Sequence, residues 1–391
     1  MMNRKSIFNS FLLIVFFLFA FGCGKAEKGS VTEWKGKIDW EDDVKVIRNP
    51  AEPVYGEIPF DLEEDLSIGR EDDENYLFYR AVDVAVDEQD NIYVLEYRNC
   101  RIQKFDRDGN YLQTIGRKGQ GPGELERPIQ LLLDKTGKIY VKDGRKVKIF
   151  DREGNYLRDF LLKNYPFELF TDGEGNIWGK FSVTKESGQA MSFDHVNSQG
   201  ETVKTIASYP YGATFKRSGD VTWGVSHQYL FDLQVAKIDD NTFCYGYSKD
   251  YELNIIDEKG DLLFRIRKEE PDYPITEKEK DKIRGQFKRA PEQVRKAILF
   301  PDHRPFFGPI LTDDKGRIYV LRIRSPLDEE KIIRYDIFSR EGYYLYRTSL
   351  SDWPQLIKGG YLYTLTTSEE TGEEQIKRFR IKNWDKIKEG I

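Results

Sequence analysis

Residues with catalytic potential are few in this chain and lie far apart. Its three histidines, His195, His227 and His303, are at least 32 residues from one another and form no HxxH or HExxH pair. Those spacings place two imidazoles on one metal ion, so metal hydrolase chemistry is not indicated. No GxSxG nucleophile element and no GxxxxGK[ST] phosphate loop occurs. We therefore expect no catalytic residue, no metal site and no cofactor.

Other polar residues recur at fixed places. Asp83, Asp87, Asp106 and Asp134 occupy repeat positions near predicted turns, which is typical of carboxylates that brace turns. The segment 116–123 is rich in glycine, but no helix pattern follows it. We interpret it as a connection between strands rather than a phosphate-binding loop.

The elements that carry these residues repeat along the chain. Residues 81–128 and 129–160 align closely: an apolar strand, an Asp-containing turn, Ile-Tyr-Val, a third strand ending in Phe-Asp, then Arg-x-Gly-Asn-Tyr-Leu and a fourth strand. Weaker copies follow at 169–178, 235–245, 310–320 and 355–363, which makes six units. Short strands of β-branched and aromatic residues between such turns predict antiparallel sheet.

The spacing of the units identifies the architecture. The glycines that close the turn after the third strand, Gly109, Gly154, Gly200, Gly260 and Gly342, are 45, 46, 60 and 82 residues apart. The last interval contains 36 residues, 267–302, without a strand pattern. A period near 45 with four strands per unit predicts an all-β, six-bladed β-propeller.

Residues 65–69 are expected to close the ring. Leu66-Ser67-Ile68-Gly69-Arg70 resembles the fourth strand of the first unit, whereas the sixth unit ends after its third strand. The early strand would therefore complete the last blade and leave only short edges exposed.

These residues carry a family resemblance. Asn91-Ile92-Tyr93-Val94 and the segments 101–109 and 116–123 resemble the NHL repeat of six-bladed propellers. With the lipobox-like Gly22-Cys23 after an apolar run, and with Asn49-Pro50 ahead of the repeats, the chain resembles the bacterial six-bladed propeller lipoproteins. The resemblance implies either a binding module or, as the alternative, a lyase or hydrolase acting at the central channel with histidines around it. Because no repeat position links the three histidines, we expect the binding module.

The first residues predict export. Arg4 and Lys5 precede an unbroken apolar run, Phe11–Phe21, and Gly22-Cys23 follows, which resembles a bacterial lipobox. An uncleaved signal anchor and ordinary secretion are the alternatives. We expect a signal peptide over 1–22, lipidation at Cys23, a tether over 23–43 and a propeller over 44–391. The protein would then lie in the bacterial cell envelope and meet the membrane only through its lipid.

Residues 267–302 predict a helical insertion between the fourth and fifth blades. Thr276 and Glu279 have the spacing of a capping box, and Pro291 suits the first turn of a second helix. The insertion would lie beside the channel mouth, either as part of a binding site or as a decoration packed on the rim.

The net charge of the chain and the positions of its basic residues indicate which ligands it binds. The formal net charge of −6 argues against a nucleic-acid partner. Basic residues nevertheless gather in loops that the propeller places on one face, where they would attract an acidic glycan, peptide or protein. The candidate ligand-binding residues are Arg98, Arg101, Arg117, Lys118, Arg145, His303 and Arg304.

Overall fold

The strands begin and end where turn residues interrupt apolar sequence. In the first unit the carboxylates of Asp87 and Asp106 each accept hydrogen bonds from the backbone N–H groups two and four residues later. Gly109 lies in the second of these turns with a φ of 84°. The equivalent glycines of the next four units have φ values between 76° and 95°, a region that favours glycine.

Six blades of four antiparallel strands result, as predicted, and the sheet of one blade is extended by two further strands. The computed structural model describes residues 33–186, 188–218, 221–368 and 371–391, and residues 34–391 form one compact unit. Blade one consists of β4 (Ala81–Val86), β5 (Ile92–Glu96), β6 (Arg101–Phe105) and β7 (Tyr111–Ile115). Blade two consists of β8 (Pro128–Leu133), β9 (Ile139–Asp143), β10 (Lys146–Phe150) and β11 (Tyr156–Leu161). Blade three consists of β12 (Tyr165–Thr171), β13 (Ile177–Lys185), β14 (Gly188–Val196) and β15 (Thr202–Pro210).

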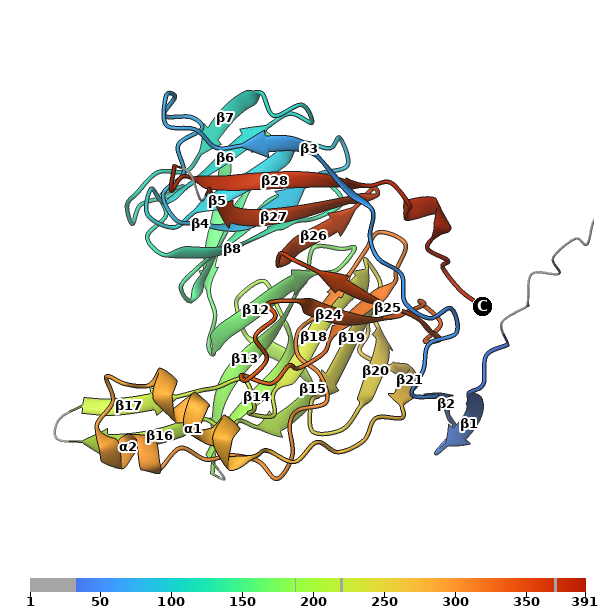
Figure 1. The fold of residues 1–391 in the computed structure, drawn as a ribbon. Coiled ribbons are helices and arrows are strands. Elements are labelled where there is room, and N and C mark those ends of the chain that lie inside the picture. Colours follow the sequence, from blue (N-terminus) through green and yellow to red (C-terminus); the bar gives the residue numbers. More distant parts are fainter. Residues whose placement is uncertain (1–32, 187, 219–220, 369–370) are drawn as a thin grey trace, which may run out of the picture. The chain divides into compact units, whose positions relative to one another are not determined.

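The second half of the chain repeats this order (Figure 1). Blade four consists of β18 (Leu233–Asp239), β19 (Thr242–Tyr247), β20 (Glu252–Asp257) and β21 (Leu262–Lys268). Blade five consists of β22 (Ile310–Thr312), β23 (Ile318–Leu321), β24 (Ile333–Phe338) and β25 (Tyr344–Leu350). Blade six takes β26 (Pro354–Lys358), β27 (Tyr361–Thr367) and β28 (Glu374–Ile381) from the end of the chain and β3 (Leu62–Ile68) from its beginning.

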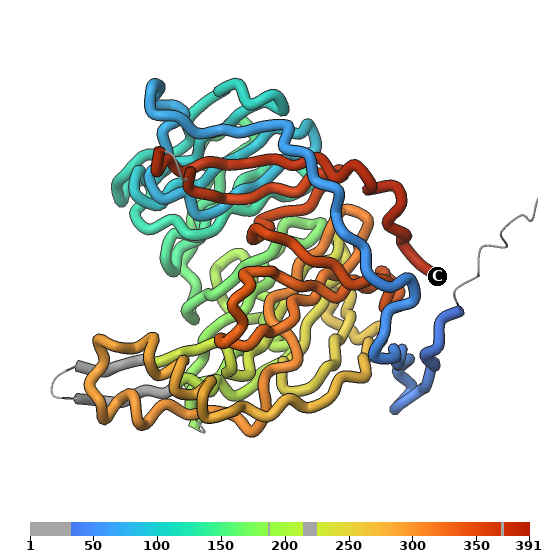
Figure 2. The backbone as a smooth tube through the Cα atoms, viewed as in Figure 1, coloured from blue at the N-terminus to red at the C-terminus, as the bar shows by residue number. Residues whose placement is uncertain are grey.

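The pairing of β3 with β28 confirms the predicted closure. The two strands run antiparallel, and the blue and red ends of the tube lie side by side (Figure 2). The guanidinium of Arg378 donates to both carboxylate oxygens of Asp65 at 3.0 and 3.1 Å, a bidentate pair across this junction.

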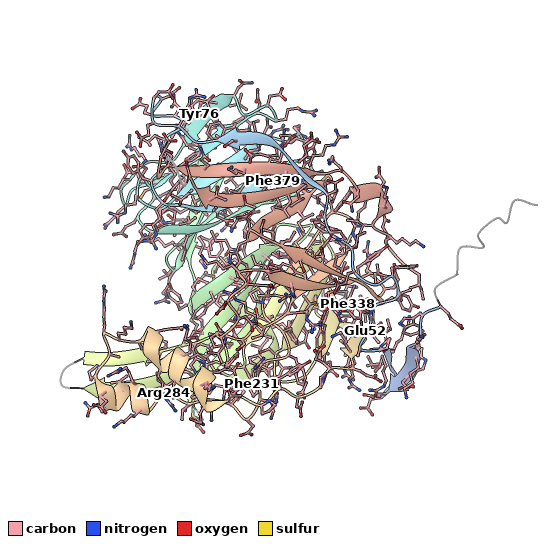
Figure 3. The ribbon with its side chains drawn as sticks, viewed as in Figure 1. Glu52, Tyr76, Phe231, Arg284, Phe338 and Phe379 are labelled. Atoms are coloured by element: carbon pink, nitrogen blue, oxygen red, sulfur yellow. The ribbon has the colours of Figure 1, made fainter. Side chains whose placement is uncertain are left out.

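The core of the ring consists of six apolar clusters, each between two consecutive blades. One of them joins Ile68 and Ile376 of blade six to Val84 and Phe105 of blade one. Another joins Ile266 of blade four to Phe338 of blade five, which is labelled in Figure 3. Because every blade buries both faces against its neighbours, the ring is continuous.

An N-terminal hairpin extends blade four. β1 (Lys37–Glu41) pairs with β2 (Val44–Asn49), and β2 pairs in parallel with β21, so this sheet has six strands. The boundary predicted between tether and propeller at residue 43 is therefore wrong, since β1 lies within 23–43. The predicted signal peptide and Cys23 lie outside the described residues.

Asn49 fastens this hairpin to the next blade. Its side chain is 1% exposed, its amide donates to the Gly342 carbonyl at 2.8 Å, and its carbonyl accepts from the Tyr344 N–H at 2.8 Å. The indole of Trp34 donates to the same oxygen at 3.1 Å. Asn49 thus satisfies buried backbone groups of blade five from a strand attached to blade four.

The insertion is helical, as predicted, but it begins later in the chain than the predicted residue 267. β21 runs to Lys268, so the insertion begins after that residue, and it contains α1 (Glu277–Gln286) and α2 (Glu292–Lys296). The capping box of Thr276 and Glu279 is present. A short 3-10 helix (Trp384–Lys386) follows the last strand, and no helix in the described ranges is long and apolar enough to cross a membrane.

A second hairpin lies between blades three and four. It consists of β16 (Thr214–Ser218) and β17 (Val221–Val225), which the sequence pattern did not predict. Val225 packs with Ala290, Val294 and Ile298 of the insertion. The insertion and this hairpin therefore form one packed unit at the edge of the propeller (Figure 1).

Replacing Asn49 by alanine should lower the free energy of unfolding by about 2 to 4 kcal/mol, because it leaves a buried N–H and a buried carbonyl of blade five without partners. Chemical denaturation of the purified propeller measures this. Asn164→Ala, in the loop after β11, is the matched control and should change stability by less than about 0.5 kcal/mol. Equal effects of the two substitutions would contradict the role given to Asn49.

Candidate functional site

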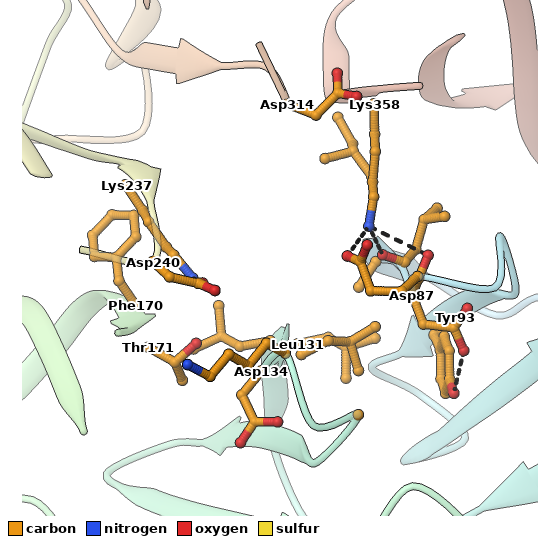
Figure 4. A pocket seen from close by; sticks show the side chains of 18 of the residues that line it. Asp87, Tyr93, Leu131, Asp134, Phe170, Thr171, Lys237, Asp240, Asp314 and Lys358 are labelled. Atoms are coloured by element: carbon orange, nitrogen blue, oxygen red, sulfur yellow. Dashed lines mark hydrogen bonds and ion pairs between the residues drawn. The ribbon is translucent and has the colours of Figure 1, made fainter. Parts of the chain in front are cut away.

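A pocket of about 750 Å³ opens at the channel between the first strands of all six blades. It lies at the end of the blades that carries the turns after the first and third strands, called here the turn face. The opposite end, with the connections between blades, is the loop face. Apolar side chains form much of the wall of the pocket at the turn face: Ala85, Leu131, Leu132, Leu133, Phe170, Ile238, Leu356 and Ile357. Figure 4 shows this channel pocket from close by.

Two lysines in the channel pocket are compensated by neighbouring acceptors. The ammonium of Lys358 donates to the Val86 carbonyl at 3.1 Å and to the Glu88 carboxylate at 2.8 Å, which joins blade six to blade one (Figure 4). Lys237 pairs with Asp240 at 2.7 Å. Lys135 and Asp314 also line the pocket, and no ion pair of either is seen among the described residues, so a ligand meets both neutralised pairs and single charges of each sign.

The turn aspartates at this face are structural. Asp87 and Asp134 accept from backbone N–H groups of their own turns and from the hydroxyls of Tyr93 and Tyr140 at 3.1 and 2.9 Å. Asp106 braces its turn in the same way. The prediction that these three carboxylates brace turns is confirmed.

Asp83 has a different role from the other three. Its carboxylate accepts from the Leu131 N–H of blade two at 2.7 Å and so links two blades. Burial raises the pKa of Asp83 to about 6, against the lowering effect of its hydrogen bonds from Leu131 and Val84.

Two further ionisable groups are Lys142 on β9 of blade two and Glu168 on β12 of blade three. Burial raises the pKa of Glu168 to about 7, although Lys180 and Lys142 oppose it. Burial also lowers the pKa of Lys142 to about 8. Lys142 donates to the Phe167 carbonyl, which ties blade two to blade three. We interpret these groups, like Asp83, as part of the contacts between blades.

The candidate basic residues all lie at the loop face, but most have partners within the protein. Arg101 pairs with Glu96 at 2.5 Å, and Arg117 pairs with Glu124 at 2.9 Å. Arg145 donates to the Leu162 carbonyl at 2.6 Å. Arg98 and Lys118 are exposed and form no side-chain ion pair or hydrogen bond in the described part of the chain.

The structure brings some of these candidates together. A second pocket of about 740 Å³, called here the loop-face pocket, is lined by Arg145 and by residues beside two other candidates, Tyr97 and Gly119. The loops that carry Arg98, Lys118 and Arg145 therefore converge. His303 and Arg304 line no part of it.

Arg304 belongs instead to a clamp that holds the insertion. The carboxylate of Glu279, 1% exposed, accepts from Arg304 at 2.7 Å, Tyr229 at 2.5 Å and Ser325 at 2.6 Å. Burial raises the pKa of Glu279, but hydrogen bonds from Ser325, Tyr229 and Thr276 outweigh it and lower the pKa to about 2. The clamp joins three loops of the loop face.

The histidines do not converge. His195 stacks on Trp178 with ring centroids 4.5 Å apart, whereas His227 contacts the Leu299 carbonyl at 2.8 Å and His303 packs against Phe231. Burial lowers the pKa of His195 and of His227. Among the described residues no group of three or more His, Cys, Asp or Glu could hold a metal ion, and the buried Cys100 and Cys244 are free thiols.

The sequence interpretation missed the channel pocket. Lys237 and Lys358 lie near the ends of the first strands of blades four and six. Aligning those strand ends across the six units would have indicated them, because every first strand borders the channel. The repeat copies of blades four and six were too weak for that alignment.

Comparison with known proteins supports the fold. Residues 72–260 match the model of a protein family described as "6-bladed beta-propeller". The Drosophila melanogaster protein "Protein brain tumor" is 28% identical over 100 residues, 24% of this chain and 10% of that protein. "Protein lin-41" of Caenorhabditis elegans is 41% identical over 46 residues, 11% of this chain and 4% of that protein. The matches thus span a tenth or less of these relatives.

Among solved structures, a putative exported protein from Bacteroides fragilis has a TM-score of 0.54 at 12% identity, and the match covers 85% of this chain and 100% of that one. At this identity the likeness concerns the fold.

Replacing Glu279 by glutamine should loosen the clamp and lower the free energy of unfolding by about 2 to 4 kcal/mol at pH 7. The folded pKa of about 2 lies below the ordinary value of 4.5, so the stabilisation is present above pH 4.5 and is lost as the pH falls toward 2. Denaturation at several pH values should therefore show the difference between wild type and variant shrinking below pH 4.5. The control, Glu292→Gln, removes an exposed ion pair with Lys296 and should cost less than about 0.5 kcal/mol. A difference that is independent of pH would contradict this account.

Proposed function

We propose that this six-bladed β-propeller, which resembles NHL-repeat propellers, is a lipid-anchored envelope protein that binds a small saccharide or peptide in the channel pocket. The observation that carries this proposal is the pocket itself. Its volume of about 750 Å³ lies in the range of small-molecule sites, which are largely apolar with a few polar groups. Walls from six blades hold its shape, so little ordering is needed when a ligand enters.

The mixed charges of the pocket, with Lys135 and Asp314 beside two ion pairs, favour a neutral or zwitterionic ligand. Lys358 is neutralised by Glu88 and Lys237 by Asp240. A ligand with a strong net charge would have to compete with these pairs and would lose part of its hydration without compensation. Hydroxyl or amide groups of a neutral ligand would instead form hydrogen bonds with the exposed carboxylate oxygens and ammonium groups of these same side chains.

The envelope location is supported by the start of the chain. The apolar run Phe11–Phe21 and the Gly22-Cys23 pair resemble a lipoprotein signal, and a putative exported protein from Bacteroides fragilis shares the fold. Ten residues lie between Cys23 and Trp34, the first residue of the compact unit, and this stretch spans at most about 40 Å. A lipid at Cys23 would therefore keep the propeller close to the membrane surface.

Blocking the pocket mouth should abolish binding. Gln89 and Asp314 line the pocket and are exposed turn residues, so Gln89→Trp with Asp314→Trp adds bulk at the mouth without entering the core. We expect ligands found on an array of peptides and oligosaccharides to bind at least about ten-fold more weakly to this double variant. The measurement is titration calorimetry at unchanged melting temperature.

The matched control, Arg107→Trp with Asp108→Trp, also introduces two tryptophans, in a turn of the same kind that does not line the pocket. Asp108 follows Asp106 in that turn as Gln89 follows Asp87. The control should bind normally. Equal affinities for all three proteins would rule out the channel pocket as the site.

Lipidation depends on Cys23 in this proposal. Metabolic labelling with an alkynyl fatty acid should mark the wild-type protein and Cys100→Ala, which keeps Cys23, but not Cys23→Ala. Label that persists in Cys23→Ala would remove the anchor from the proposal.

A further inference from the structure

The loop-face pocket is built by blade two and by the segments on either side of it. Its wall combines the connection between β7 and β8, the turn between β9 and β10, and the start of β12. The residues that line it are Tyr97, Gly119, Gln120, Glu126, Arg127, Ile129, Asp143, Gly144, Arg145, Lys146, Lys148, Leu161 and Tyr165. Four of these carry positive charge and two carry negative charge.

The two carboxylates are partly satisfied by groups of the wall. Asp143 accepts from the backbone N–H of Glu126 at 3.1 Å and from that of Arg127. Glu126 accepts from the Gln120 amide at 3.0 Å. Neither carboxylate forms an ion pair with a cation of the pocket in the described part of the chain.

The cations are less well compensated. Arg127 and Lys146 are exposed, and within the described ranges neither side chain makes an ion pair or a hydrogen bond. Lys148 is 1% exposed, yet its ammonium lies 3.6 Å from Asp159 and 3.4 Å from the Gly121 carbonyl, both long contacts. A buried cation with only long contacts favours an additional negative partner.

Aromatic rings flank these cations. Tyr165 is 48% exposed at the start of β12 and packs edge-on against Phe167. Tyr97 also lines the pocket, with one face covered by the guanidinium of Arg80 at 4.3 Å. Tyr165 therefore offers an accessible apolar face within the same pocket as the cations.

We propose that the loop-face pocket binds an acidic saccharide, with its oxyanion on Arg127, Lys146 and Lys148 and its ring against Tyr165. Glu126, Asp143 and Gln120 accept hydrogen bonds from the sugar hydroxyls. These same carboxylates repel a ligand with several closely spaced negative charges, which favours a saccharide with isolated oxyanions over a polyacidic peptide. This site lies apart from the channel pocket and does not depend on it.

Titration calorimetry with four probes tests the ligand class: trigalacturonate, glucose 6-phosphate, neutral maltotriose and triglutamate. Trigalacturonate or glucose 6-phosphate should bind, more weakly at 0.3 M than at about 0.05 M salt, and the stronger of the two identifies carboxylate or phosphate as the oxyanion. Maltotriose should not bind measurably. Triglutamate that binds as tightly as the acidic sugars would overturn the proposal.

Variants locate the site. Arg127→Gln with Lys146→Gln should weaken binding of the acidic sugar about ten-fold or more, because charge-assisted hydrogen bonds are lost. Tyr165→Ala should weaken it as well. The control pair, Lys138→Gln with Lys259→Gln, removes exposed cations outside the pocket and should have no effect beyond a small salt-sensitive change.

Two results would refute the site. One is an equal loss in the control pair, which would indicate general attraction to cationic surface. The other is full binding by the Arg127 and Lys146 double variant. The channel block at Gln89 and Asp314 should leave the acidic sugar bound, so failure of this inference and failure of the channel proposal can be told apart.

Discussion

Each blade of this protein is apolar on both faces, and the structure depends on burying every one of these faces against a neighbouring blade. Six clusters between consecutive blades achieve this only if the first and last blades meet. That junction is made by β3, whose Ile68 is 2% exposed and packs with residues of blade one. The strand comes from the beginning of the chain and pairs with β28 from its end, so closure joins residues more than 300 positions apart. The channel and the pocket at its mouth, which all six blades line, exist because this ring is complete.

The charged residues of the protein divide into those that hold blades together and those that remain available. Asp83, Lys142 and Lys358 connect neighbouring blades through backbone groups, and Asp87 and Asp134 brace turns. A buried charge that lacks such partners is costly, so the chain uses most of its inner ionisable side chains for cohesion. The channel pocket at one end carries charges of both signs, whereas the loop-face pocket at the other end carries a less compensated set of cations. The two ends are therefore suited to ligands of different charge.

Blades four and five carry the parts that distinguish this chain from a plain propeller. The β1–β2 hairpin extends blade four, and Asn49 connects it to blade five. The helical insertion leaves from the end of the same sheet, and Glu279 clamps it to two other loops. Both additions bury polar groups that are satisfied by specific partners, which fixes their position better than apolar contact alone. The segment expected to be a simple tether thus contributes to the folded unit.

The sequence by itself determined the blade number, the strand order, the closing strand and the capping box of the insertion. These follow from local signals: Asp and Gly at turns, a period near 45 and one Thr-x-x-Glu spacing. It did not reveal β1 and β2, because β2 pairs in parallel with β21, more than 200 residues away, and matches no repeat. Nor could it show that Arg101, Arg117, Arg145 and Arg304 have internal acceptors, while Arg127 and Lys146 have none among the residues that the structure describes. The availability of a charge depends on which distant groups come within hydrogen-bond distance, and only the tertiary structure decides that.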